Sequence, residues 1–193
     1  MDRKPLPHRE NNRIPNYDYS QTGSYYLTIC TKNRNPVLSK ILVGAGLPDC
    51  PVSAVPNARG QSGTPDPTGP RVELLPYGEI ADKYIRQMDA FYEHISVECY
   101  VIMPDHIHLL VSICRDSLED QQFTESFYEQ KAPCNSVIAQ FVGTFKRFCN
   151  KEYGENIWQR SYYDHAVRNQ TDYNEIWEYI ENNPQKWAIN HER

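Results

Sequence analysis

CYVIMPDHIHLLV, residues 99–111, is an apolar stretch that carries two histidines. Runs rich in Val, Ile and Leu are typical of buried strands. Residues i and i+2 of a strand point to the same face, so His106 and His108 are expected to emerge side by side, while Ile107 points to the opposite face. Two adjacent imidazoles are costly to bury unless a partner satisfies them. Of the two candidate partners, hydrogen-bonding core neighbours and a metal cation, the paired pattern favours the metal.

Further strands are expected on both sides of this histidine pair. Turn chemistry at Pro104-Asp105 predicts that residues 95–103 and 106–113 form a tight antiparallel pair. The run Tyr25–Thr31, rich in β-branched and aromatic residues, is predicted to be the first strand. Residues 157–160 are a short candidate for the last strand.

Three amphipathic helices are predicted where apolar residues recur at helical spacing. They cover about residues 80–92, 137–149 and 173–180. Asp172 and Glu175 resemble a capping box for the third helix, and Asn182-Asn183-Pro184 is expected to stop it.

The resulting order is strand, helix, strand, strand, helix, candidate strand, helix. This order is typical of an α+β fold of the ferredoxin-like sandwich type. We expect one antiparallel sheet with helices packed on one of its faces. The histidine pair is expected on a central strand, on the face that also receives Tyr162.

Length and composition set the domain organisation. The chain has 193 residues, which is enough for one domain with a real core and too short for two comfortable ones. We expect a single domain over residues 24–187, preceded by a flexible arm at 1–23 and followed by a tail at 188–193. Residues 44–70 hold six Pro and five Gly, so they are predicted to form a flexible insertion.

Composition also limits the compartment and the partners. No apolar stretch reaches the length of a membrane span, and the polar N-terminus lacks the apolar region of a signal peptide, so a cytoplasmic protein is expected. The six cysteines form no C-x-x-C pair and are expected to be reduced thiols rather than zinc ligands. The net charge of −5 argues against a bulk electrostatic nucleic-acid binder, although the acidic excess is central and permits a basic face at either end.

A second dense segment runs from Trp158 to Arg168 and contains two tyrosines, a histidine, an acid and two arginines. If this segment is helical, Tyr162 and His165 share a face, and His165 is then able to complete a three-ligand site with the histidine pair. If it is extended, the two side chains point to opposite faces and His165 is the weaker candidate. In the simpler interpretation, which the segment by itself favours, the tyrosines are core and interface aromatics and Asp164 pairs with Arg168 at the surface.

Three ordered motifs together resemble a known family. They are YVIMPDHIHLLV at residues 100–111, IWQRSYYDHAVRN at 157–169 and YIENNPQKW at 179–187. From about Tyr25 to Trp187 the chain is similar to the REP-associated tyrosine transposases of the IS200/IS605-like Y1 transposase superfamily. The mark of that superfamily is a His-hydrophobe-His pair with one downstream tyrosine.

The resemblance implies a metal-dependent endonuclease and strand transferase that cuts single-stranded DNA near a hairpin during transposition. His106 and His108 match the pair that binds Mg²⁺ or Mn²⁺ in the family, together with a third polar side chain. Tyr162 is matched to the nucleophile, with the adjacent Tyr163 as the alternative. Its attack on phosphorus gives a 5′-phosphotyrosine intermediate.

The third metal ligand is a separate hypothesis. Some transposases of the superfamily use Gln one helical turn after the tyrosine, and Ala166, which holds that place here, cannot ligate a metal. His165 is the nearest substitute and is therefore the residue we expect as third ligand.

The implied partner is single-stranded or hairpin DNA, and no membrane partner is expected. The protein is expected to be associated with the nucleoid, as a monomer or a homodimer. Arg160, Arg168, Lys146 and Arg147 are candidate phosphate contacts, as are the cations of the arm at 1–23. Taken one at a time, each such cation is more commonly a solvated surface group.

Two other functions fit part of the pattern. One is a domesticated relative that binds hairpin DNA with weak or no cleavage, although the presence of His106, His108 and Tyr162 favours the enzyme. The other is an unrelated zinc hydrolase with the same histidine pair, for which the sequence offers no neighbouring His-x-x-x-Asp or Glu-x-x-His complement.

Overall fold

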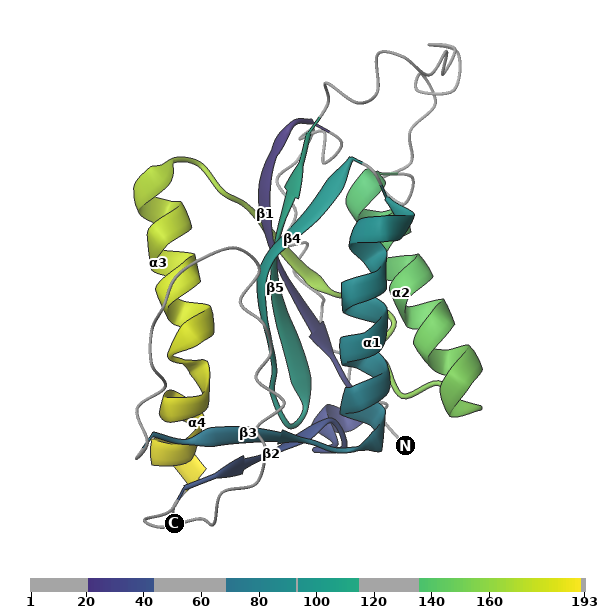
Figure 1. Cartoon of the computed structure of the whole chain (residues 1–193), viewed down its shortest axis with the longest axis vertical. Coiled ribbons are helices and arrows are strands. Elements are labelled where there is room, and N and C mark those ends of the chain that lie inside the picture. Colours follow the sequence, from purple (N-terminus) through teal and green to yellow (C-terminus); the bar gives the residue numbers. More distant parts are fainter. Residues whose placement is uncertain (1–20, 44–68, 93, 115–135, 192–193) are drawn as a thin grey trace, which may run out of the picture.

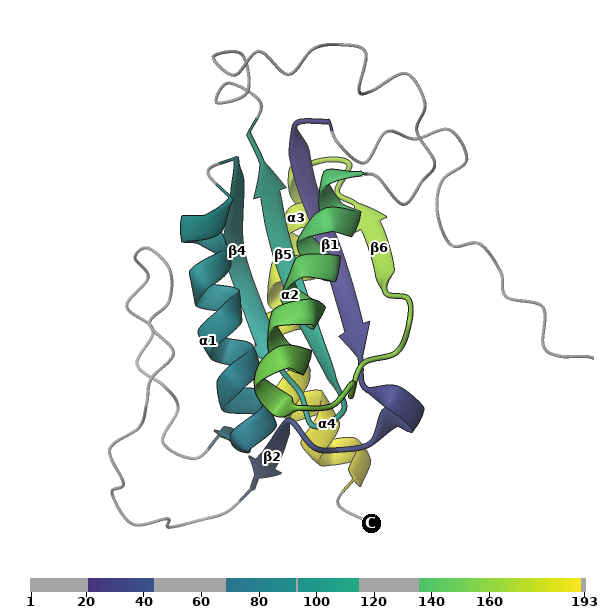
Figure 2. The ribbon, with the colours of Figure 1, turned by 90° about the vertical axis from the view of Figure 1, so that its right-hand side faces the viewer.

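Antiparallel pairing on both sides of β1 builds the sheet that carries the histidines. The computed structural model describes residues 21–43, 69–92, 94–114 and 136–191. Within these residues, four strands form an antiparallel sheet in the order β4-β5-β1-β6 (Figure 1; β6 is labelled in Figure 2). Their bounds are Gly23–Cys30 for β1, Ile95–Ile102 for β4, His106–Ile113 for β5 and Tyr163–Ala166 for β6.

The hairpin of β4 and β5 places His106 directly after a turn. Met103 N donates to His106 O (2.8 Å), which closes the connection through Pro104-Asp105 that turn chemistry predicts. Because β5 lies between β4 and β1, the histidine pair is on a central strand, as expected. In the register with β1, His108 lies opposite Thr28.

Alternation along the strands gives the sheet two different faces. Tyr25, Leu27 and Ile29 of β1 are fully buried, and together with Ile107 and Leu109 of β5 they belong to the apolar core. The residues between them on each strand, which include both histidines, point to the other face.

Helices α1 (Pro76–Phe91) and α2 (Val137–Tyr153) cover the apolar face (Figure 2). Ser136 caps α2 by accepting a hydrogen bond from Ala139 N (3.2 Å), and Gly154 ends it in the left-handed conformation (φ 77°) that glycine adopts without strain. Buried apolar side chains of both helices complete the core: Ile85, Met88, Ile138, Phe141 and Phe145.

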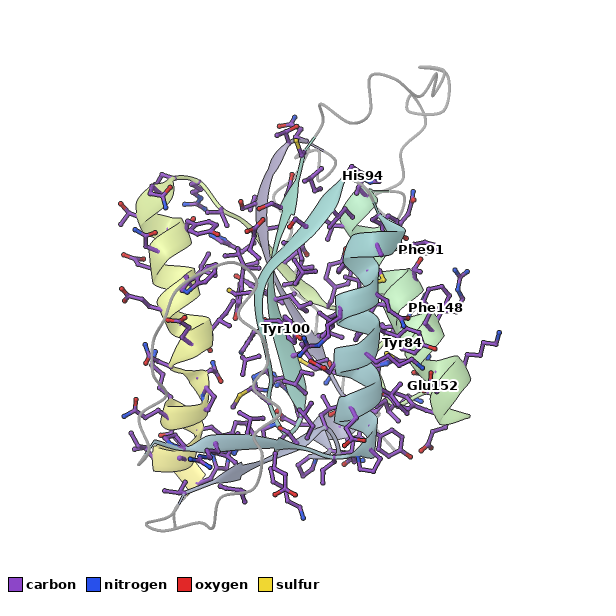
Figure 3. All side chains as sticks on the ribbon, in the orientation of Figure 1. Tyr84, Phe91, His94, Tyr100, Phe148 and Glu152 are labelled. Atoms are coloured by element: carbon purple, nitrogen blue, oxygen red, sulfur yellow. The ribbon has the colours of Figure 1, made fainter. Side chains whose placement is uncertain are left out.

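Contacts at the outer surface also join α1 to α2. Figure 3 labels Tyr84 of α1 beside Phe148 and Glu152 of α2. The rings of Tyr84 and Phe148 have centroids 5.5 Å apart, and Tyr84 Oη donates to Glu152 Oε2 (2.7 Å). The two helices therefore form one layer on the side of the sheet away from the histidines.

The second face is covered by α3 (Gln170–Glu181) and α4 (Asn183–His191), which lie behind the strands in Figure 2. The expectation that helices pack on one face only is wrong. Leu110 of β5 is fully buried yet points to the histidine face, so β5 presents apolar surface on both sides and needs cover on both.

The path from α3 to α4 is nearly continuous. Asn182-Asn183-Pro184 ends α3, as predicted, but a new helix begins at once, because Pro184 sits in a first turn, where its missing N–H needs no partner. Lys186 N donates to Asn182 O (3.1 Å) across the junction. Residues 188–191 are therefore helical where the sequence predicted a tail.

The last strand lies later than the sequence suggested. Residues 157–160 are outside it, although Trp158 pairs with Thr31 in an isolated bridge. With this shift, the order of elements confirms the α+β sandwich.

Beyond the sheet, a short ribbon of β2 (Ser39–Leu42) and β3 (Arg71–Leu74) lies near α4, and a 3₁₀ turn, η1 (Lys32–Arg34), follows β1 (Figure 1). Most of the predicted arm and of the predicted insertion lies outside the described residues. No helix among those described is long and apolar enough to cross a membrane.

Candidate metal and nucleophile site

His106 and His108 lie side by side on the face of β5 that α3 and α4 cover. Their Nε2 atoms are 3.0 Å apart, and the two residues are only 8% and 4% exposed. The shared face that the i, i+2 spacing predicts is therefore confirmed.

The other ring nitrogen of each histidine is held by a neighbour. His106 Nδ1 donates to Asp105 Oδ1. His108 Nδ1 lies 2.6 Å from Tyr26 Oη and 3.0 Å from Thr28 Oγ1. Outer partners of this kind fix the ring orientation of metal-ligating histidines, and here they leave the two Nε2 atoms facing each other.

Burial keeps both imidazoles neutral. Desolvation lowers the pKa of His106, against the opposing effect of its hydrogen bond to Asp105. Desolvation, assisted by the nearby His106, lowers the pKa of His108 to about 3. The neutral imidazole is the form that binds a metal, so both side chains are in the ligating form at neutral pH.

One side of the α3–α4 path faces the two histidines. The ring centroid of Tyr179 lies 5.3 Å from that of His108, and the ring centroid of Trp187 lies 5.9 Å from that of His106. Asn183 is four residues from each, so it occupies the same helical side between them. Its burial, with 6% exposed, agrees with this position.

The donor set suits a divalent cation. Among the described residues, no group of three or more His, Cys, Asp and Glu side chains is placed to hold a metal. The side-chain oxygen of Asn183 is, however, a type of ligand that Mg²⁺ and Mn²⁺ accept. Two imidazoles and one amide oxygen fit such an ion if water and phosphate oxygens complete its coordination shell.

Tyr179 is reachable from solvent and has a cation beside it. The residue is 40% exposed, and Lys186 Nζ lies 4.8 Å from its ring centroid. A phenol accessible to a substrate thus lies directly against His108.

The structure separates the two tyrosines that the sequence indicates. Tyr163 lies opposite Thr28 on the histidine face, with its ring centroid 6.3 Å from that of Tyr26. Tyr162 packs instead against the apolar core, with Lys146 Nζ 6.0 Å from its ring centroid. The expectation that Tyr162 shares the face of the histidine pair is therefore wrong, because the chain is extended here and adjacent side chains point to opposite faces.

His165 is turned toward α3 rather than toward the histidine pair. Its Nε2 lies 3.0 Å from Asp172 Oδ2, which also accepts a hydrogen bond from Arg168 N (3.0 Å). The strand of His165, β6, is separated from β5 by β1. The structure thus places His165 as a link between β6 and α3 and does not bring it to the other two histidines.

Lys146 has a structural position. Its Nζ donates to Gln159 O (2.8 Å) and Ser161 O (3.0 Å), and burial lowers its pKa to about 8. This half-buried cation therefore holds the segment that leads into β6.

The other three candidate phosphate contacts are exposed. Arg147 lies over the ring of Phe148 (5.6 Å) on the side of α1 and α2, away from the histidines. Arg160 and Arg168 lie before and after β6. The structure therefore separates Arg147, which lies on the side of α1 and α2, from the two arginines that flank β6.

Tyr179 and Asn183 are the site residues that sequence reasoning missed. Both belong to the motif YIENNPQKW. Because a helix stop was expected at Asn182-Asn183-Pro184, the sequence did not indicate that Tyr179 and Asn183 lie on the same helical side. The signal that finds them is the spacing of Tyr179, Asn183 and Trp187 at i, i+4 and i+8.

Comparison with known proteins shows the fold. No family model matches the sequence. An uncharacterized protein of Haemophilus influenzae is 24% identical over 190 residues, which cover 94% of this chain and 91% of that protein. The structure of a REP-associated tyrosine transposase bound to a REP hairpin aligns with a TM-score of 0.54 and 17% identity, over 91% of this chain and 74% of that chain. A candidate transposase from Deinococcus radiodurans aligns with a TM-score of only 0.39 and 19% identity, over 88% of this chain and 95% of that chain.

Proposed function

We propose that this protein is a REP-associated tyrosine transposase that nicks and rejoins single-stranded DNA near hairpins. One observation carries the proposal: the exposed Tyr179 ring lies against His108, whose Nε2 faces that of His106. A nucleophile beside two neutral nitrogen ligands is what metal-assisted phosphoryl transfer to a tyrosine needs. The fold shared with a REP-associated tyrosine transposase supports the same activity.

Tyr179 suits the role of nucleophile better than the other tyrosines. Tyr26 contacts the same His108, but burial raises the pKa of Tyr26 well above its usual range, and its Oη is engaged by the imidazole. Tyr163 is exposed on the histidine face but lies on β6, on the far side of β1. Tyr162 packs on the opposite face.

His106, His108 and the side-chain oxygen of Asn183 are the residues that would hold Mg²⁺ or Mn²⁺. When bound, such a cation supplies a Lewis acid for a non-bridging oxygen of the scissile phosphate. The role of the protein is to orient these ligands. Asp105 holds His106 through its Nδ1 atom, and Tyr26 holds His108 in the same way.

The proposed reaction conserves the energy of the broken bond. Tyr179 Oη attacks phosphorus and forms a 5′-phosphotyrosine, while the bond from phosphorus to the 3′ oxygen breaks. The 3′ oxygen leaves with the electron pair and takes up a proton, and the tyrosine proton passes to solvent. Attack by a 3′-hydroxyl on the adduct reverses these steps, so strands are joined without ATP.

Hairpin DNA is the proposed substrate. The structural neighbour is bound to a REP hairpin. Arg160 and Arg168 are exposed beside β6 for phosphate contacts, and Tyr163, 42% exposed on the histidine face, offers a ring on which a base can stack.

A denaturing gel tests the proposal. The protein is incubated with labelled single-stranded hairpin DNAs from the flanks of its own gene, with Mn²⁺ or with EDTA. We expect a metal-dependent protein–DNA band that is absent in Tyr179→Phe. The matched controls Tyr162→Phe and Tyr163→Phe lose the same hydroxyl group and should retain the band.

Two outcomes would contradict the proposal. Gel-shift binding with no adduct in any metal would identify a hairpin-binding protein that has lost cleavage. An adduct that survives in Tyr179→Phe and disappears in Tyr163→Phe would move the nucleophile to β6.

A further inference from the structure

We propose that Lys186 is a further catalytic residue, whose ammonium group stabilises the negative charge on Tyr179 Oη when the tyrosine attacks the DNA phosphate and when it leaves during joining. The inference rests on the proposed function, because it takes Tyr179 as the nucleophile. In this inference, a side chain of the protein, Lys186, supplies positive charge at the reacting oxygen of Tyr179.

Lys186 lies on the same side of the helical path as Tyr179. It follows Tyr179 by seven positions, about two helical turns, and its Nζ lies 4.8 Å from the ring centroid. The lysine is exposed, so its flexible four-carbon stem is able to carry the ammonium group from the ring face to the phenol oxygen.

The charges around the site leave this role open for a cation. Arg34 is directed to Asp105, with Nη1 3.6 Å from Oδ2, and therefore belongs to the group that orients His106. Among the cations of the described residues, Lys186 is the one found over the Tyr179 ring.

The reaction concentrates negative charge on the oxygen of the tyrosine ring over which Lys186 lies. The phosphate already carries one negative charge, and the attacking oxygen adds a second as its proton passes to solvent. The oxygen–phosphorus bond forms while the bond to the 3′ oxygen breaks, and that oxygen leaves with the electron pair and is protonated from solvent. In joining, the same tyrosine oxygen departs with the electron pair, so one cation serves both directions.

A cation at the nucleophile and a cation that only binds DNA phosphate give different kinetics. A phosphate contact strengthens binding and steepens its dependence on salt. A cation at the reacting oxygen changes the rate of the chemical step at saturating DNA and leaves the dissociation constant unchanged.

The test measures single-turnover adduct formation at saturating hairpin DNA and Mn²⁺, with the dissociation constant from gel shifts over a range of salt. Lys186→Ala should slow adduct formation by about ten- to a hundredfold, which is less than the roughly hundred- to thousandfold loss for a buried preorganised donor because Lys186 is exposed. Its dissociation constant should match that of the wild type. Lys186→Arg keeps the charge and should restore most of the rate.

Lys151→Ala is the matched control. It removes the same charge from the exposed last turn of α2, on the opposite side of the sheet, and should react at the wild-type rate. The purified wild-type and Lys186→Ala adducts, mixed with a strand that ends in a 3′-hydroxyl, should show joining slowed by a similar factor in the variant. Circular dichroism and thermal midpoints verify that each variant is folded.

Two kinds of result overturn the inference. If Tyr179→Phe abolishes the adduct but Lys186→Ala reacts at the wild-type rate, the proposed function holds and the role of Lys186 is wrong. Weaker binding with a flatter salt dependence and an unchanged saturating rate has the same meaning. If the wild type forms no adduct, or Tyr179→Phe forms one, the proposed function and the inference fall together.

Discussion

On one face of the four-stranded sheet, α1 and α2 enclose an apolar core, whereas on the other face α3 and α4 enclose two histidines, an asparagine and a group of aromatic rings. Neighbouring residues of one strand belong to different faces, as Ile107 and His108 do. The sheet therefore holds a polar cluster on a backbone that the opposite face stabilises. The two faces should respond differently to substitution, and the predictions below test that difference.

The largest loss of stability is expected on the apolar face. Phe141 of α2 is 1% exposed, so Phe141→Ala removes a buried ring, leaves a cavity and should lower the free energy of unfolding by about 3–5 kcal/mol. Urea denaturation measures this change. Phe91→Ala is the matched control at a ring 59% exposed and should cost less than about 1 kcal/mol. Equal losses at the two positions would contradict the division into layers.

The histidine face should make the free energy of unfolding depend on pH. The pKa of folded His108 is about 3, below the ordinary value of 6.5, so between these values the unfolded chain binds more protons than the folded one. Stability should therefore be complete above about 6.5 and should fall as the pH drops toward 3, by on the order of a few kcal/mol.

Urea denaturation in EDTA across that pH range measures the effect. His108→Gln should show a flatter pH dependence than the wild type, whatever its stability at neutral pH. A variant whose stability falls as steeply with acid as that of the wild type would show that the buried imidazole is not the cause.

Metal binding tests the histidine face at a single side chain, the amide of Asn183. Asn183→Ala should weaken Mn²⁺ binding by about tenfold or more, because it removes the oxygen that we propose as a ligand, whereas Asn183→Asp keeps that oxygen and should retain affinity. Titration calorimetry on the folded protein measures the affinity. Asn190→Ala, on an exposed part of α4, is the matched control. Equal affinities for Asn183→Ala and the wild type would remove the amide from the site.

The sequence predicted the histidine face because local rules decide it. Period-2 alternation places His106 and His108 together, and Pro104-Asp105 closes the hairpin, so the strand and its side-chain directions follow from adjacent residues. The helices α1 and α2 follow in the same way from apolar spacing.

The tyrosine that we propose as nucleophile was not predictable by those rules. Tyr162 was selected by its position along the chain, but it directly precedes β6 and packs against the apolar core on the other face. Tyr179 reaches His108 only through the packing of α3 across the sheet, a contact between residues 71 positions apart in the chain. The new helix that begins beside Pro184 was not predictable either, because a proline that ends one helix is also favourable in the first turn of the next.

The smallest effects are expected at His165, which the sequence proposed as a metal ligand. Its hydrogen bond to Asp172 joins two partly exposed groups, so His165→Ala should lower the free energy of unfolding by about 1 kcal/mol or less. Mn²⁺ affinity should be unchanged, because β1 separates β6 from the histidine pair. A loss of affinity as large as that of Asn183→Ala would return His165 to the metal site. Because Tyr26 pairs with His165 on β6 and contacts His108 on β5, that result would require the β1–β6 pairing to break so that His165 could cross β1 on the face it already shares with the pair.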